Sequence, residues 1–185
     1  NGTELAQMLY FAAGWDKGPI AIRYPRGTIP ETEIKYPLPE LAGLNWEILR
    51  EGENLLILAC GSMVSVAGKL ADSLFENHKL STTLVNCRVI KPLDEKMLSR
   101  LLSRFNKVVT MEENVLTGGF GSAILEYIEN NYLTGLSVKR IGLPDSFVTH
   151  GDRKSLLQEL GLDDESILKK VEDFLGLRAD KKKLV

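Results

Sequence analysis

Two adjacent carboxylates and a glycine-rich turn form the stretch of this sequence best suited to chemistry. Glu112 and Glu113 follow a run rich in β-branched residues, and Gly118, Gly119 and Gly121 precede an apolar-striped run. This pattern predicts a strand, a loop and a helix. A helix that begins at such glycines offers an anion its backbone N–H groups and the positive end of its dipole. The spacing is neither a dinucleotide fingerprint nor a P-loop, so a structural turn is the simpler interpretation.

The titratable side chains of this region have a chemical and a structural interpretation. Glu112 and Glu113 are a possible acid/base pair, but adjacent strand residues point to opposite faces, so at most one enters a given site. No neighbouring substrate position is identified, which favours structural or interface roles. His150 precedes Gly151 in a predicted loop and is a candidate interface or loop-anchoring residue, with direct proton transfer as the alternative.

Cysteine, histidine and charge content exclude several classes of protein. Cys60 and Cys87 each follow an apolar run, which predicts buried thiols rather than a disulfide. His78 and His150 stand far apart, and no zinc-ligand spacing exists. With 23 basic and 25 acidic residues, the chain shows no electrostatic signature of nucleic-acid or anionic-membrane binding.

Length and hydropathy predict a globular chain in the cytoplasm. No apolar run reaches the ~18 residues of a membrane span, and the first residues do not resemble a signal peptide. The 185 residues, 44% of them hydrophobic, can build one large domain or one domain and part of another.

The elements predicted in the first 45 residues are too few to form a complete domain. Apolar spacing over 3–15 predicts a helix that ends near Gly14, with Thr3 as its N-cap, and a short strand over 20–24 that stops at Pro25. A lone helix and a lone strand suggest that 1–27 is the end of a domain. Prolines without a usable period then predict a linker over 28–45.

From residue 46 the pattern alternates regularly between strands and helices. Strands are predicted at 46–50, 55–60, 80–85, 107–111 and 137–141, and helices follow Ser62 and Asp94 as N-caps and occupy 118–133, 153–160 and 163–175. The first two strands are joined by a short turn, which predicts an antiparallel hairpin. The whole predicts an α/β fold over 46–177, a three-layer sandwich with a mostly parallel sheet and one antiparallel edge strand. Residues 178–185 are a charged tail.

Four motifs in this order resemble 1-deoxy-D-xylulose-5-phosphate synthases. They are Ile22-Arg23-Tyr24-Pro25-Arg26-Gly27, Val89-Ile90-Lys91-Pro92-Leu93-Asp94, Met111-Glu112-Glu113-Asn114 with Gly118-Gly119-Phe120-Gly121-Ser122, and Ile141-Gly142-Leu143-Pro144-Asp145 with Phe147 and His150-Gly151. The resemblance covers nearly the whole chain and concerns the family's C-terminal portion. It identifies 1–27 with the end of the pyrimidine-binding domain and 46–177 with the transketolase-type C-terminal domain.

The resemblance implies a thiamine-diphosphate- and Mg²⁺-dependent transferase. Such enzymes condense pyruvate with glyceraldehyde 3-phosphate, release CO₂ and supply isoprenoid, thiamine and pyridoxal synthesis. This chain has no Gly-Asp-Gly with a downstream Asn for metal and diphosphate, and the family's cofactor-contacting glutamate falls upstream of Asn1. We therefore expect the isolated chain to be inactive, with no catalytic, cofactor or metal residue, and to serve assembly, with a homodimer as the expected partner arrangement.

The same resemblance implies one substrate contact within this chain. It places Arg26 at the phosphate of glyceraldehyde 3-phosphate, with Arg23 as the weaker candidate. A guanidinium stays charged and can hold a phosphate with two parallel hydrogen bonds. The alternative is a surface arginine paired with an acidic neighbour.

The sequence is also compatible with other functional classes. Residues 47–177 could form an independent ligand-binding module with a site near Cys60, Ser62 and Glu113-Asn114, at the carboxyl ends of the strands. They could also form a purely structural assembly domain. Among enzymes, the alternative is the C-terminal domain of a transketolase or of a 2-oxo acid dehydrogenase β subunit. The segments 24–27 and 142–145 favour the synthase.

Overall fold

The computed structural model describes residues 1–25, 37, 38, 43 and 45–177. Contacts divide the chain into two compact units, Asn1–Asn45 and a second that begins at Trp46. Arg26, most of the predicted linker 28–45 and the predicted tail 178–185 lie outside the described residues.

The first unit contains helix α1, Gly2–Ala13. The side chain of Asn1 caps it, since its Oδ1 accepts the backbone N–H of Glu4 at 2.8 Å. The prediction of Thr3 as the cap was therefore wrong, because Asn1 already fills the position before the first turn and Thr3 lies within the helix. Among the described residues of α1 only Gly2 is buried, so its apolar stripe remains at least partly exposed.

The predicted strand over 20–24 was also wrong. Residues 20–25 form no strand, and all but Ile22 are exposed. A strand is defined by hydrogen bonds to a neighbour, and this segment pairs with none of the described strands. An apolar, β-branched composition is therefore not sufficient to make this segment a strand.

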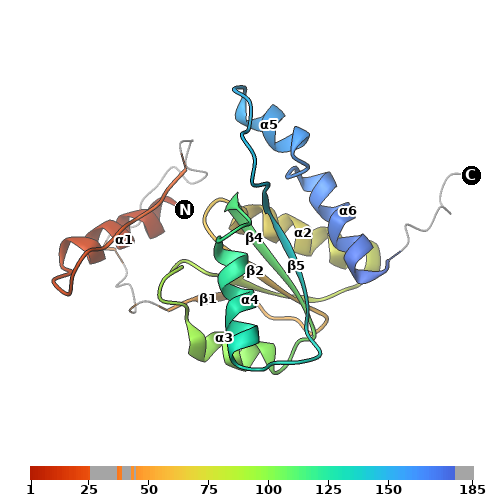
Figure 1. Cartoon of the computed structure of the whole chain (residues 1–185), viewed down its shortest axis with the longest axis horizontal. Helices are drawn as coiled ribbons and strands as arrows, with labels where there is room; N and C mark the ends of the chain where they lie inside the picture. Colours follow the sequence, from red (N-terminus) through yellow and green to blue (C-terminus); the bar gives the residue numbers. More distant parts are fainter. Residues whose placement is uncertain (26–36, 39–42, 44, 178–185) are drawn as a thin grey trace, which may run out of the picture. The chain divides into compact units, whose positions relative to one another are not determined.

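The second unit is a five-stranded sheet covered by helices on both faces (Figure 1). In chain order its elements are β1 (Glu47–Arg50), β2 (Leu55–Ala59), α2 (Met63–His78), β3 (Thr82–Asn86), α3 (Glu95–Leu102), β4 (Lys107–Val115), α4 (Phe120–Asn130), β5 (Ser137–Leu143), α5 (Arg153–Glu159) and α6 (Asp164–Leu175). The strand order is β1-β3-β2-β4-β5, and only the β1–β3 pair is antiparallel. This confirms the predicted fold class.

Apolar content explains the order of the strands. All five residues of β2 are apolar and fully buried, as a strand between two neighbours and two helical layers requires. Helices α2 and α6 build one core layer with Ile57 and Val109, whereas α3 and α4 build the other with Leu58 and Val108. Strand β1 carries a charge at each end and is largely exposed, which suits a sheet edge.

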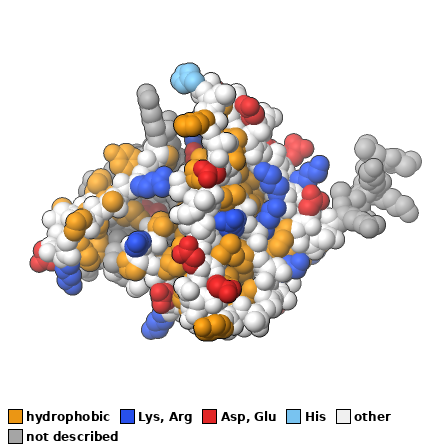
Figure 2. Space-filling view, viewed as in Figure 1, with side chains coloured by type: hydrophobic (Ala, Val, Ile, Leu, Met, Phe, Trp, Pro, Cys, Tyr) orange, Lys and Arg blue, Asp and Glu red, His pale blue; other side chains and the backbone are white. Residues whose placement is uncertain are grey.

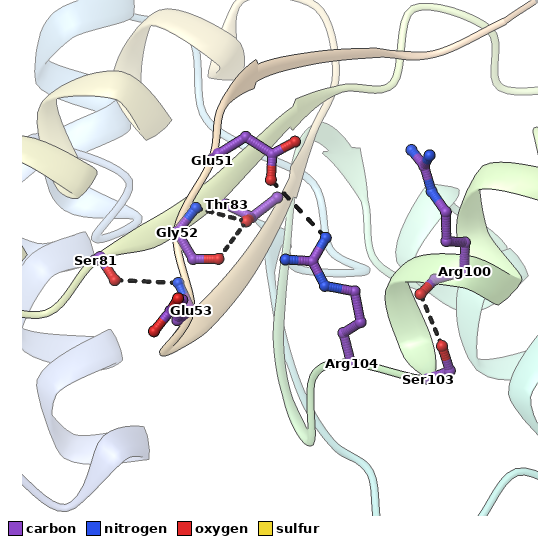
Figure 3. A network of polar contacts seen from close by, with 8 residues as sticks. All are labelled: Glu51, Gly52, Glu53, Ser81, Thr83, Arg100, Ser103 and Arg104. Atoms are coloured by element: carbon purple, nitrogen blue, oxygen red, sulfur yellow. Dashed lines mark hydrogen bonds and ion pairs between the residues drawn. The ribbon is translucent and has the colours of Figure 1, made fainter.

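The predicted β1–β2 hairpin was wrong, because β3 lies between the two strands. The link over 51–54 crosses the amino end of β3 (Figure 3). The Gly52 N–H donates to Thr83 Oγ1 at 2.9 Å, and that hydroxyl donates to the Gly52 carbonyl at 2.8 Å. A Cβ at Gly52 would meet the backbone of Thr82 at 2.5 Å, so only glycine allows this crossing.

Asp94 connects the edge of the sheet to helix α3. Its Oδ1 accepts the Met97 N–H at 3.0 Å, which confirms the predicted cap, and its Oδ2 accepts the Trp46 N–H at 3.0 Å. The indole Nε1 of Trp46 donates to the Val89 carbonyl at 2.7 Å, and its ring meets Phe120 edge-on at 5.9 Å. The start of β1 is thereby fixed over the α3–α4 layer.

Candidate functional site

The carboxyl ends of β2, β3 and β4 meet at one edge of the sheet, where open α/β folds place their ligand sites. The chemically competent side chains gather there. They are Cys60, Ser62, Cys87, Glu112, Glu113 and Asn114.

Glu112 points into the protein and binds the start of helix α4. Its side chain is 1% exposed, and its two oxygens accept the N–H groups of Phe120 and Gly121 at 2.7 and 2.8 Å. A carboxylate in this place pairs with the positive end of the helix dipole and satisfies two N–H groups that have no partner within the helix. The anion-binding position suggested by the glycine-rich turn is therefore filled by the chain's own carboxylate.

Gly119 of this turn and Gly142 of β5 make room for Glu112. A Cβ at Gly119 would overlap both the Glu112 carboxylate and the Val115 carbonyl oxygen, and a Cβ at Gly142 would lie 3.1 Å from Glu112 Cγ. Gly118 adopts φ +67°, a left-handed conformation that glycine adopts without cost. The structural interpretation of the turn is thus explained by packing around Glu112 and by the left-handed backbone of Gly118. This loop does not fit a diphosphate, because its helix N-terminus is already occupied.

A second set of contacts closes the same turn. Arg140 Nη1 donates to the Leu116 carbonyl at 3.0 Å and to Ser122 Oγ at 2.9 Å. Ser122 Oγ in turn donates to the Leu116 carbonyl at 2.6 Å and accepts the Gly118 N–H at 3.2 Å. Arg140 was not identified from the sequence, because it is one of two adjacent basic residues on β5 with no local signal.

Glu113 faces the other side of the sheet and joins two helices. It accepts hydrogen bonds from Ser62 Oγ, at the start of α2, and from Arg153 Nε at 3.0 Å and Nη2, at the start of α5. Ser62 was predicted to cap α2, but its hydroxyl makes no cap bond and donates to Glu113 instead. Burial raises the pKa of Glu113, but the bonds from Arg153 and Ser62 outweigh burial and lower it overall. Glu113 thus acts as an anionic anchor for α5.

The other residues singled out in the sequence lie apart from this edge or are exposed. His150 lies in the loop between β5 and α5, where residues 144–152 are exposed, and Phe147 there has no cover from the described chain. Arg23 is exposed in the first unit, and Arg26 lies outside the described residues. The assignment of Arg26 and Arg23 to a substrate phosphate therefore stays a prediction.

The part of the chain that the structure describes shows no metal-binding cluster and no membrane-spanning helix. That part contains no group of three or more His, Cys, Asp or Glu side chains arranged to hold a metal ion. It also contains no helix with the length and hydropathy needed to cross a membrane. On the face shown in Figure 2, acidic and basic side chains are interspersed.

The fold and this closed edge define an α/β domain with a mostly parallel sheet. Residues 44–167 match the family model described as transketolase, C-terminal domain. The chain belongs to that family.

Several curated relatives of the chain are 1-deoxy-D-xylulose-5-phosphate synthases. The chain is 40% identical over 172 residues to the 1-deoxy-D-xylulose-5-phosphate synthase of Geobacillus sp. strain WCH70, covering 93% of this chain and 27% of that protein. It is 41% identical over 183 residues to the synthase of Pelotomaculum thermopropionicum, covering 98% and 28%. The chain thus spans about a quarter of the length of these relatives. The resemblance drawn from the four motifs is confirmed.

A solved structure shows the same relation to transketolase. A structure described as a split-gene transketolase in an inactive β4 tetramer has a TM-score of 0.67 and 28% sequence identity to this chain. The match covers 80% of this chain and 47% of that one.

Proposed function

We propose that this chain is the C-terminal portion of a 1-deoxy-D-xylulose-5-phosphate synthase. The complete enzyme would act in the cytoplasm with thiamine diphosphate and Mg²⁺. It would condense pyruvate with glyceraldehyde 3-phosphate, release CO₂ and supply isoprenoid, thiamine and pyridoxal synthesis. The observation that carries the proposal is the 40% identity to synthases along 93% of the chain. The cofactor would supply the carbon–carbon bond chemistry, and the protein would bind and orient the reactants.

Within that enzyme we propose that this portion serves assembly. Residues 1–27 would complete a pyrimidine-binding domain, 28–45 would link it, 46–177 would form the transketolase-type domain, and 178–185 would be a charged tail. The internal use of Glu112 and Glu113 supports a structural role, because both carboxylates already bind groups of the chain itself. A homodimer is the expected assembly, and the similar split-gene transketolase, described as an inactive tetramer, supports self-association without activity.

The proposed substrate contact is Arg26, with Arg23 as the weaker candidate. Arg26 stands between Pro25, which restricts the backbone before it, and Gly27, which places no side chain beside it. A guanidinium there can hold the phosphate of glyceraldehyde 3-phosphate with two charge-assisted hydrogen bonds.

The test compares two arginine variants of the complete enzyme. Arg26→Ala should raise the KM for glyceraldehyde 3-phosphate by well over tenfold, about 1.4 kcal/mol or more, while the KM for pyruvate changes much less. Arg23→Ala is the matched control, since it removes the same charge three residues away, and should have the smaller effect. Unchanged constants in a folded Arg26→Ala enzyme would refute the assignment.

The second candidate is the C-terminal domain of a transketolase or a 2-oxo acid dehydrogenase β subunit. The 28% identity to a split-gene transketolase favours it, but the identity to synthases is higher and extends over more of the chain. The reactants used by the complete enzyme distinguish the two.

A further inference from the structure

The two cysteines of the chain occupy equivalent places on neighbouring strands. Cys60 directly follows β2 and Cys87 directly follows β3. The last residues of these parallel strands, Ala59 and Asn86, are register partners. The Cys87 N–H donates to the Ala59 carbonyl at 2.8 Å, so the parallel ladder continues past the strand ends. Cys60 and Cys87 are therefore the next pair in register.

Both thiols lie on the same face of the sheet. Side chains alternate between faces, and Leu56 and Leu58 of β2 pack in one core cluster with Val85 of β3. Cys87 belongs to that cluster, and Cys60 packs against it. The spacing of neighbouring strands, about 4.8 Å, falls within the Cα separations of disulfides, about 4.4–6.8 Å.

The two sulfurs differ in accessibility. Cys60 is half-buried, and its Sγ donates to the Met111 carbonyl at 3.6 Å. Cys87 is fully buried. Burial, with further contributions from Cys60 and Asp94, raises the pKa of Cys87 well above its ordinary value. An oxidant from solvent therefore reaches Cys60 first, and Cys87 lies beside it as the second thiol.

We propose that Cys60 and Cys87 form an oxidation site, in which a hydroperoxide converts the pair to an intramolecular disulfide. The Cys60 sulfur attacks a peroxide oxygen, so that an S–O bond forms and the O–O bond breaks, and the leaving oxygen takes the Cys60 thiol proton and departs as water or an alcohol. The Cys87 sulfur then attacks the Cys60 sulfur of the sulfenic acid. The S–S bond forms, the S–O bond breaks, and the departing hydroxide takes the Cys87 proton and leaves as water. Two thiols are oxidised and one peroxide is reduced.

The disulfide would join the carboxyl ends of β2 and β3 at the edge that also holds Glu113. It would close the loop that contains α2, which is a constraint on the unfolded chain. A thiol reductant reverses the step.

The experiment treats the complete folded chain with hydrogen peroxide, quenches it, alkylates it under denaturing conditions and digests it without reductant. The expected result is one linked peptide containing Cys60 and Cys87, with both thiols lost together and both recovered after dithiothreitol. Cys60→Ser should leave Cys87 reduced at the same peroxide dose. Cys87→Ala should leave Cys60 as a sulfenic acid that a dimedone probe captures.

Two outcomes in the unmutated chain would overturn the proposal, independently of how the variants fold. One is the conversion of Cys60 to sulfinic acid while Cys87 stays fully alkylatable. The other is an intermolecular Cys60–Cys60 link without the internal one.

Discussion

Replacing Glu112 by glutamine tests whether this carboxylate holds the start of α4. The two backbone N–H groups it accepts, at 2.7 and 2.8 Å, both require an acceptor. A glutamine amide offers one oxygen and one NH₂ group, so one buried donor loses its partner. An unsatisfied buried donor costs about 1–3 kcal/mol, and the lost helix-dipole interaction adds about 0.3–1 kcal/mol. Relief from burying a charge offsets part of this cost.

We expect Glu112→Gln to lower the free energy of unfolding by about 2 kcal/mol, or the Tm by about 4–8 °C for a chain of this size. Urea denaturation followed by far-UV circular dichroism measures it. Glu126→Gln is the matched control, since Glu126 is exposed on the same helix, and its effect should stay within about 0.5 kcal/mol. A Glu112→Gln chain as stable as the control would refute the account of the α4 start.

Two further predictions concern the same edge of the sheet. Glu113→Gln should lower the free energy of unfolding by about 1 kcal/mol at neutral pH. Because the pKa of Glu113 is lowered in the folded chain, its contribution is present above the ordinary value of 4.5 and is lost as the pH falls through the folded-state pKa. Denaturation at several pH values should show the unfolding free energies of the unmutated and Glu113→Gln chains becoming equal in acid. A difference that stays constant with pH would contradict the anchor role. Gly118→Ala should cost about 1–2 kcal/mol for its left-handed backbone, whereas Gly119→Ala should cost about 3 kcal/mol or more, because its Cβ overlaps a backbone carbonyl. Equal thermal shifts for the two alanine variants would contradict the described packing.

Local signals in the sequence predicted the fold class well. The unbroken apolar run of β2 predicted a strand buried on both faces, and Asp94 before a striped run predicted a helix start. Both predictions depend on residues that lie within a few positions of each other in the sequence. The β1–β2 hairpin failed because a short connection does not reveal that β3 lies between the two strands.

The site depended on contacts that no local pattern reveals. Ser62 meets Glu113 across 51 residues, and Arg153 meets it across 40. Serine before a helix usually accepts a backbone N–H of the first turn, but the Ser62 hydroxyl donates to the Glu113 carboxylate instead. Strand alternation correctly separated Glu112 from Glu113 but could not show what each would bind.

The most direct test of the central proposal is to measure which reactants the complete enzyme converts. With thiamine diphosphate and Mg²⁺ present, the enzyme would be given pyruvate with glyceraldehyde 3-phosphate, a ketose phosphate with an aldose phosphate, and a 2-oxo acid with a lipoyl acceptor. Mass spectrometry and CO₂ release measure the products. The account predicts 1-deoxy-D-xylulose 5-phosphate and CO₂ in equal amounts from the first pair. Turnover of either other pair without product from the first would contradict it.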